Sequence, residues 1–323
     1  MKARNQWRGV RFVAVIAALF AFTISAQSAV LIDEVFDTGY NRTVNNIVGG
    51  NLAWSKGRSG TIPTVNVGSL SFSASANGGA DGEWGYFTDP GANFVIPDSV
   101  NSVVSDGHVL LGVGDMLTAS VSLYLGVMPS NTADAALRFG LFDSPNGRSV
   151  QDFNGSPSST MFTNNPGFAT FFSLMNVATN NGMSILSHTV LTSASIFSSS
   201  GNFSQIDGSG GGAMTGMQSM TNYTLSFSVE RPDANTWQLE SQVRDTLTGA
   251  LIEGMLVTTN AGPSSFNMMM LRWNRSPDGA VAPRVYTEIK VYMNFPDEIP
   301  EPSTLLLVGT GLALAALTFR RRR

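Results

Sequence analysis

Apolar and polar residues alternate strictly between positions 117 and 127, and this pattern constrains the fold more than any other feature. Thr118, Ser120, Ser122 and Tyr124 hold the even positions. Successive side chains of a strand point to opposite faces, so a period of two predicts a strand with one buried face and one solvated face. Such a strand needs paired neighbours and a second layer over its apolar side. The apolar positions are Leu117, Ala119, Val121, Leu123, Leu125 and Val127.

Similar signals recur along the chain and are separated by turn-forming residues such as Asn180-Asn181-Gly182. Residues 193–220 are rich in serine and glycine and predict a long loop, while residues 97–105 predict one short helix. About fourteen short strands at this spacing indicate an all-β protein, an antiparallel β-sandwich of two stacked sheets. Besides 117–127, strands are expected near residues 47–54, 70–74, 84–88, 108–113, 137–141, 168–177, 183–190, 223–229, 237–243, 251–258, 266–273 and 285–291.

The N-terminus has the layout of a secretory signal peptide. Lys2, Arg4, Arg8 and Arg11 form a positive region, an apolar run follows at residues 12–24, and small residues follow that run. We therefore expect residues 1–29 to be a signal peptide, with cleavage between Ala26 and Ala29. An uncleaved anchor is the alternative, and the short apolar run disfavours it.

The C-terminus combines an extended segment, an apolar run and a cluster of cations. Pro300, Glu301 and Pro302 precede an uncharged stretch that ends at residue 319, and Arg320, Arg321, Arg322 and Arg323 follow. The two prolines prevent a helix from continuing backwards. Residues 303–319 are long enough for a short transmembrane helix, and the arginines should hold its end in the cytoplasm. A plain membrane anchor and a processed tail are both compatible with this pattern.

This order of Pro-Glu-Pro, apolar helix and arginine cluster resembles the PEP-CTERM sorting signal of Gram-negative bacteria. The resemblance implies export, transient anchoring in the inner membrane, and removal of the tail by an exosortase at Pro300, Glu301 and Pro302. It also implies a destination at the cell surface or in the exopolysaccharide matrix. The chain would then comprise a signal peptide at 1–29, an extracellular domain at 30–295 and a sorting tail at 296–323.

Three segments of the body resemble a concanavalin-A-like jelly roll. They are residues 111–117 leading into the long strand, residues 137–143, and the closing pair of strands at 266–273 and 284–292. The resemblance implies two antiparallel sheets with jelly-roll connections, and it leaves a ligand undefined.

The charge balance excludes one class of partner. Without the four basic leader residues, the four tail arginines and Glu301, the chain keeps 11 basic and 22 acidic residues, a net charge of about −11. Nucleic-acid binding needs a basic face, so we expect no nucleic-acid partner. The chain contains no cysteine, so its stability outside the cell must come from its core and not from disulfides.

Asp81, Glu83 and Trp84 bring two carboxylates and an aromatic ring within four residues and are a candidate glycan platform. A retaining glycosidase needs two carboxyl groups about 5–5.5 Å apart, and neighbours on a strand point to opposite faces. We therefore expect an ordinary turn leading into a strand here, and no catalytic residues. Trp54, Trp237 and Trp273 join Trp84 as aromatic candidates, with core packing as their more common fate.

The candidate metal ligands are sparse. His108 and His188 are isolated, and a zinc site wants three or four clustered ligands. Calcium is the better expectation, although the aspartates lie in turns without the EF-hand spacing. The turn aspartates are Asp115, Asp143, Asp152, Asp207 and Asp278.

Three functions follow from these patterns. The favoured one is a non-enzymatic exported surface or matrix protein that is structural or binds extracellular polysaccharide, with the secretion machinery and an exosortase as processing partners. The second is a secreted jelly-roll enzyme acting on glycans, and the third is a surface domain that keeps its membrane anchor.

Overall fold

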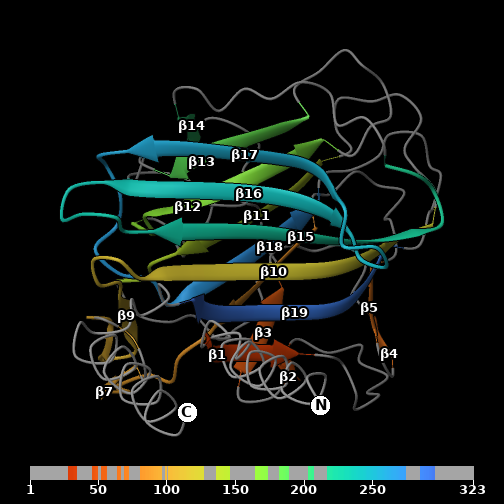
Figure 1. Ribbon diagram of the computed structural model, residues 1–323. Helices are drawn as coiled ribbons and strands as arrows, with labels where there is room; N and C mark the ends of the chain where they lie inside the picture. The colour runs from red at the N-terminus through yellow and green to blue at the C-terminus, as the bar shows by residue number, and fades with distance from the viewer. Residues whose placement is uncertain are drawn as a thin grey trace, which may run out of the picture. The chain divides into compact units, whose positions relative to one another are not determined.

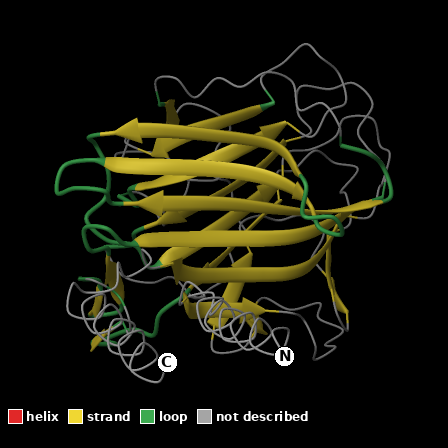
Figure 2. Ribbon diagram, in the orientation of Figure 1, coloured by secondary structure: helices red, strands yellow, loops and turns green. Residues whose placement is uncertain are grey.

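A computed structural model of the chain describes the greater part of residues 28–294. The described residues are 28–34, 46–49, 52–56, 64–66, 69–72, 81–96, 99, 101–126, 136–145, 164–173, 182–188, 203–206, 217–273 and 284–294. They contain nineteen strands, and all strand pairs between them are antiparallel. The expected all-β class and the antiparallel pairing are confirmed (Figure 2).

The first sheet, sheet A, has eight strands and is built around β10 (Met116–Leu125). One side of β10 continues through the meander β15 (Thr221–Glu230), β16 (Trp237–Asp245) and β17 (Leu251–Thr259). The other side pairs with β19 (Arg284–Asn294). The free edge of β19 is shared by β1 (Ser28–Glu34) and by β5 (Ser69–Phe72), which pairs with β4 (Thr64–Asn66).

The second sheet, sheet B, also has eight strands, and its centre is the pair formed by β11 (Ala136–Phe142) and β18 (Met268–Trp273). Strands β12 (Gly167–Ser173), β13 (Met183–His188) and β14 (Phe203–Gln205) extend it on one side. Strands β6 (Asp81–Tyr86), β3 (Leu52–Lys56) and β2 (Asn46–Gly49) extend it on the other.

The two sheets stack face to face and share one core (Figure 1). The Phe139 ring of sheet B meets the Phe227 ring of sheet A edge-on, with centroids 6.5 Å apart. The hydroxyls of Thr170 and Ser241 also meet across the layers at 2.7 Å, and both residues are fully buried. The core is therefore apolar with a matched pair of hydroxyls inside it, since a buried polar group needs a partner.

A third, small sheet lies at one end of the sandwich and supports the candidate site. It consists of β7 (Phe94–Val95), β8 (Val103–Ser105) and β9 (His108–Leu110). An isolated bridge between Val109 and Phe266 joins β9 to the segment that precedes β18. The small sheet is thus fixed to the start of a central strand of sheet B.

The long alternating strand is confirmed, but its polar face differs from the expectation. The apolar residues of β10 from Leu117 to Leu125 are at most 2% exposed, as predicted. Thr118, Ser120 and Ser122 are buried as well, at 2–8% exposure. Their strand is central, and longer side chains lie beside them in register, with Lys290 next to Ser120 and Glu288 next to Ser122.

Several element predictions were wrong in detail. Strand β6 begins at Asp81, so the turn expected to lead into the strand at 84–88 is wrong, because residues 81–86 pair along their length with β18. The helix expected at 97–105 is wrong at its end, where β8 pairs with both β7 and β9. The single strand expected at 47–54 is a hairpin of β2 and β3, and the long loop at 193–220 contains β14.

Residues 28–294 form one compact unit, and the extracellular domain expected at 30–295 remains a prediction. The signal peptide at 1–29 lies almost wholly outside the described residues, and the sorting tail at 296–323 lies wholly outside them. Within the described part of the chain, no helix has the length and apolar character that a membrane span requires.

Candidate functional site

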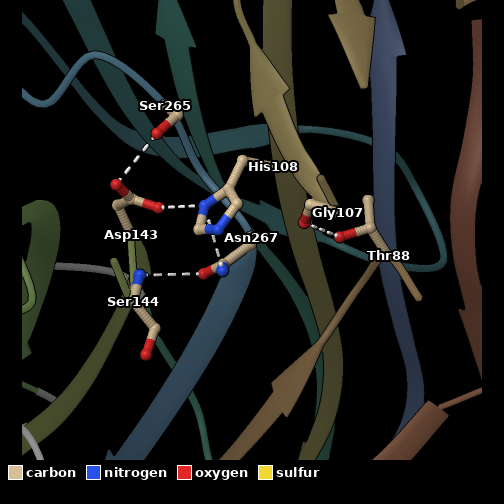
Figure 3. Close-up of polar contacts among 7 residues, drawn as sticks. All are labelled: Thr88, Gly107, His108, Asp143, Ser144, Ser265 and Asn267. Carbon is tan, nitrogen blue, oxygen red and sulfur yellow. Dashed lines mark hydrogen bonds and ion pairs between the residues drawn. The ribbon is translucent and has the colours of Figure 1, made fainter. Parts of the chain in front are cut away.

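Polar side chains from three distant segments meet where the small sheet joins sheet B (Figure 3). Nδ1 of His108, on β9, lies 2.6 Å from Oδ1 of Asp143, the residue that follows β11. The second carboxylate oxygen of Asp143 accepts a hydrogen bond of 2.8 Å from the Ser265 hydroxyl. Asp143 is 5% exposed, so its charge is held by these two donors and not by bulk water.

The sequence explains how His108 reaches this place. Asp106 and Gly107 both have positive φ values, 50° and 74°, and form the two-residue turn between β8 and β9. Asp-Gly suits a hairpin turn that needs positive φ at both positions. The Thr88 hydroxyl donates to the Gly107 carbonyl oxygen, which fixes the turn from outside.

Asn267 also contacts Nδ1 of His108. Its Oδ1 accepts a hydrogen bond of 3.0 Å from the Ser144 backbone N–H, so its Nδ2 is a donor. That Nδ2 lies 3.2 Å from Nδ1 of His108. The Nδ1–H group of His108 donates to the carboxylate of Asp143, so the contact between the two nitrogens is not a hydrogen bond.

The cluster lacks the order of a nucleophilic triad. In a Ser-His-Asp triad the serine hydroxyl is bonded to the histidine nitrogen that faces away from the carboxylate. Here Ser265 donates to the carboxylate itself, and no described hydroxyl is hydrogen-bonded to Nε2 of His108. The side chain of His108 is 23% exposed, so Nε2 is a partly accessible acceptor on a fixed ring.

His188 lies nearby but in a different state. Its Nδ1 donates to the Asn165 carbonyl oxygen at 2.6 Å, and the Phe203 ring lies over it with centroids 5.0 Å apart. Burial lowers the pKa of His188, while the bond to Asn165 opposes that shift. Nε2 of His188 and Nδ2 of Asn165 are both buried and make no hydrogen bond with described residues.

The metal expectations receive no support from the described residues, which contain no group of three or more His, Asp or Glu residues able to hold an ion. Asp143 is bonded to His108 and Ser265, and Asp115 accepts hydrogen bonds from Asn101 and Ser102. Asp152, Asp207 and Asp278 lie outside the described residues.

A pocket of about 350 Å³ opens at the same end of the sandwich, beside the turn between β15 and β16. Its wall includes Arg231 and Trp237, and its rim is formed by that turn and by the segment between β17 and β18. Ser264 lies on the rim, one residue before the Ser265 that binds Asp143. The remaining lining residues are Ala234, Asn235, Asn260, Gly262 and Pro263.

The sequence-predicted platform lies elsewhere, on β6. In register, Glu83 pairs with Leu271 and Trp84 pairs with Met270, and these two residues of β18 alternate between the faces of sheet B. The backbone therefore places positions 81 and 83 on one face and position 84 on the other. The structure describes the backbone of these three residues but not their side chains, and the platform remains a prediction.

Sequence reasoning missed both the His108–Asp143 contact and the Arg231 pocket. His108 and Asp143 were each recognised as candidates, but they are 35 positions apart and nothing in the sequence pairs them. Trp237 was expected in the core, and at 7% exposure it is mostly buried, with its edge at the pocket. The remaining candidates, residues 300–302 and 320–323, lie outside the described residues.

Comparison with known proteins identifies the tail. Residues 298–323 match the PEP-CTERM protein-sorting motif, which confirms the resemblance seen in the sequence. No curated protein is similar to the chain in sequence.

Solved structures with a similar backbone include several lectins. Peanut lectin has a TM-score of 0.41 and 9% identity, over 84% of this chain and 99% of that chain. The Emp47p carbohydrate recognition domain has a TM-score of 0.41 and 13% identity, over 84% of this chain and 99% of that chain. The Ca²⁺/Man3GlcNAc-bound VIP36 exoplasmic/lumenal domain has a TM-score of 0.40 and 9% identity, over 78% of this chain and 87% of that chain. The fold described above rests on the strand pairing of this chain itself.

Proposed function

Because residues 298–323 carry a PEP-CTERM protein-sorting motif, we propose that the chain is an exported surface protein whose tail is removed by an exosortase-type enzyme. The secretion machinery reads residues 1–29, and the helix at 303–319 then holds the protein in the inner membrane of a Gram-negative bacterium. Arg320 to Arg323 keep the end of that helix in the cytoplasm. Cleavage near Pro300, Glu301 and Pro302 frees the body for the cell surface or the exopolysaccharide matrix.

The body acts by binding or by forming structure, and not by catalysis. Among the described residues, the histidine best placed for chemistry, His108, has a carboxylate partner but no nucleophile on its other nitrogen. A body with a net charge of about −11 and no cysteine suits an extracellular role. Extracellular polysaccharide is the proposed ligand, and Asp81, Glu83 and Trp84 remain one proposed platform for it. Calcium binding at Asp143 would require the displacement of His108 and Ser265.

The sorting motif itself carries this proposal, and changing it is the direct test. We expect a variant with Pro300, Glu301 and Pro302 replaced by alanine to stay in the membrane fraction with its terminal arginines. Wild-type protein recovered from the surface or the medium should lack them. Intact-mass spectrometry of both fractions measures the difference.

Pro296→Ala is the matched control, because Pro296 lies just upstream of the matched residues. It should be processed like the wild type. A wild-type protein whose surface form still carries Arg320 to Arg323 would instead support a permanently anchored domain.

A further inference from the structure

The pocket beside the turn between β15 and β16 is lined by the cation of Arg231, and none of its lining residues is acidic. Nη1 of Arg231 donates to the Leu111 carbonyl oxygen at 3.0 Å, and Nη2 donates to the Ala234 carbonyl oxygen at 3.1 Å. Both acceptors are neutral, and Arg231 forms no ion pair with a described residue. Its Nε is buried and makes no hydrogen bond within the described part of the chain.

The acidic residue of the same turn, Asp233, is bound by the backbone of that turn. The carboxylate of Asp233 accepts a hydrogen bond of 2.8 Å from the Asn235 backbone N–H, and that bond is the main cause that lowers its pKa. Arg231 makes only the smallest contribution to that shift. Asp233 does not line the pocket, and the lining residues include no acid.

The wall that carries this cation is rigid. The Arg231 guanidinium lies 5.5 Å from the centre of the Trp237 ring, a cation–π distance. Behind it, Trp237 packs against Phe168 at 6.3 Å and against Phe266 at 5.9 Å between ring centres. Gly262 closes the remaining side, where an added Cβ would lie 2.6 Å from the indole nitrogen. The cation is therefore held in place before any ligand arrives, which lowers the entropic cost of binding.

The rim offers groups that can both donate and accept hydrogen bonds. Asn235, Asn260 and Ser264 are exposed, and their side chains make no hydrogen bond with described residues. Carboxamides and hydroxyls are suited to the hydroxyl groups of a sugar. A volume of about 350 Å³ lies at the small end of the usual range for ligand pockets, which favours one or two sugar rings.

We propose that this pocket binds an acidic sugar residue, with a uronic acid as the ligand class. Arg231 attracts the carboxylate of the uronic acid, and the rim residues bind the hydroxyls of the sugar ring. The cation–π contact with Trp237 holds the guanidinium in position. This inference rests on the proposed function, because it takes the ligand to be part of an acidic exopolysaccharide.

The test compares two asparagine-to-aspartate variants in the exported protein isolated from its host. Asn260→Asp adds a carboxylate to the rim with little change in size, whereas Asn222→Asp adds the same charge to an exposed position at the opposite end of β15. Binding of trigalacturonic acid and of neutral galactotriose is measured by titration calorimetry at low and high salt. We expect the wild type to bind the acid in preference to the neutral trimer and more weakly at high salt.

We expect Asn260→Asp to weaken binding of trigalacturonic acid at least about tenfold and Asn222→Asp to leave it within about twofold. Equal weakening by both variants, equal binding of the two trimers, or unchanged binding by Asn260→Asp would overturn the proposal. Tail removal is read separately by mass spectrometry. Suppose that the Asn260→Asp protein is processed and binds the host's polysaccharide as well as the wild type does. The proposed function would then stand, and only the assignment of the ligand to this pocket would fail.

Discussion

The two histidines show how strongly the partners of a residue decide its state. His108 donates to a carboxylate and keeps a partly exposed ring, whereas His188 donates to a carbonyl oxygen and is 1% exposed. For His188, burial disfavours the charged ring and lowers its pKa. Both residues looked alike in the sequence, as isolated histidines.

His188 makes the stability of the fold depend on pH. Burial lowers its pKa in the folded state, so the unfolded chain binds the proton more readily. The stabilising contribution is complete above the unfolded pKa of about 6.5 and is lost as the pH falls through that value towards the folded pKa. We expect the urea midpoint of the wild type to decrease between pH 7.5 and pH 5.

His188→Gln is the comparison that isolates this effect, because every other titratable group is present in both proteins and its contribution cancels. The free energy of unfolding of the wild type should fall relative to the variant, by at most about 1.4 kcal/mol per pH unit. Parallel pH profiles for the two proteins would contradict the assignment.

At the scale of elements, close contact between strands matters as much as the hydrophobic pattern. Gly140 of β11 pairs with Ala169 of β12, and an added Cβ at Gly140 would lie 2.3 Å from the Phe168 carbonyl oxygen and 2.8 Å from the Ala169 Cα atom. These are backbone atoms, so relief requires the two strands to move apart. The glycine therefore permits β11 and β12 to pair.

Gly140→Ala should destabilise the protein by about 3 kcal/mol or more, because overpacking against backbone cannot relax through a rotamer change. Gly254→Ala on β17 is the matched control, since its nearest neighbours would lie 3.7 Å away in ordinary contact. Urea unfolding of the two variants measures the difference. Similar midpoints for both would show that the strands separate at little cost.

At the scale of the whole molecule, the two sheets stabilise each other through one core. Phe227 of sheet A is fully buried against Phe139 of sheet B, and Phe168 of sheet B packs against Trp237 of sheet A. The chain contains no cysteine, so no disulfide crosslinks the strands of either sheet. Loss of packing in one sheet should therefore destabilise both sheets.

Phe227→Ala should lower the free energy of unfolding by roughly 3–5 kcal/mol, through lost burial and the cavity that remains. Hydrogen exchange should accelerate in β11 and β18 of sheet B as well as in β10 and β15 of sheet A. Acceleration confined to sheet A would mean that the sheets open independently.

The sequence by itself determined the local properties of this protein. Period-two alternation located β10, β11 and the meander from β15 to β17, because strand geometry repeats every two residues. The tail was recognisable for a similar reason, since its prolines, apolar run and arginines act in chain order. Short strands such as β7, β8 and β14 escaped notice, because two or three residues carry no periodic signal.

Only the tertiary structure decided which distant residues meet. Asp143 and Ser265 are 122 positions apart, and Arg231 and Leu111 are 120 positions apart, yet each pair is hydrogen-bonded. Such contacts depend on strand order and on the stacking of the sheets, and neither is encoded in a short window of sequence. Packing likewise buried Thr118, Ser120 and Ser122, whose polar pattern had predicted a solvated face, because the width of the sheet and its longer neighbours cover them.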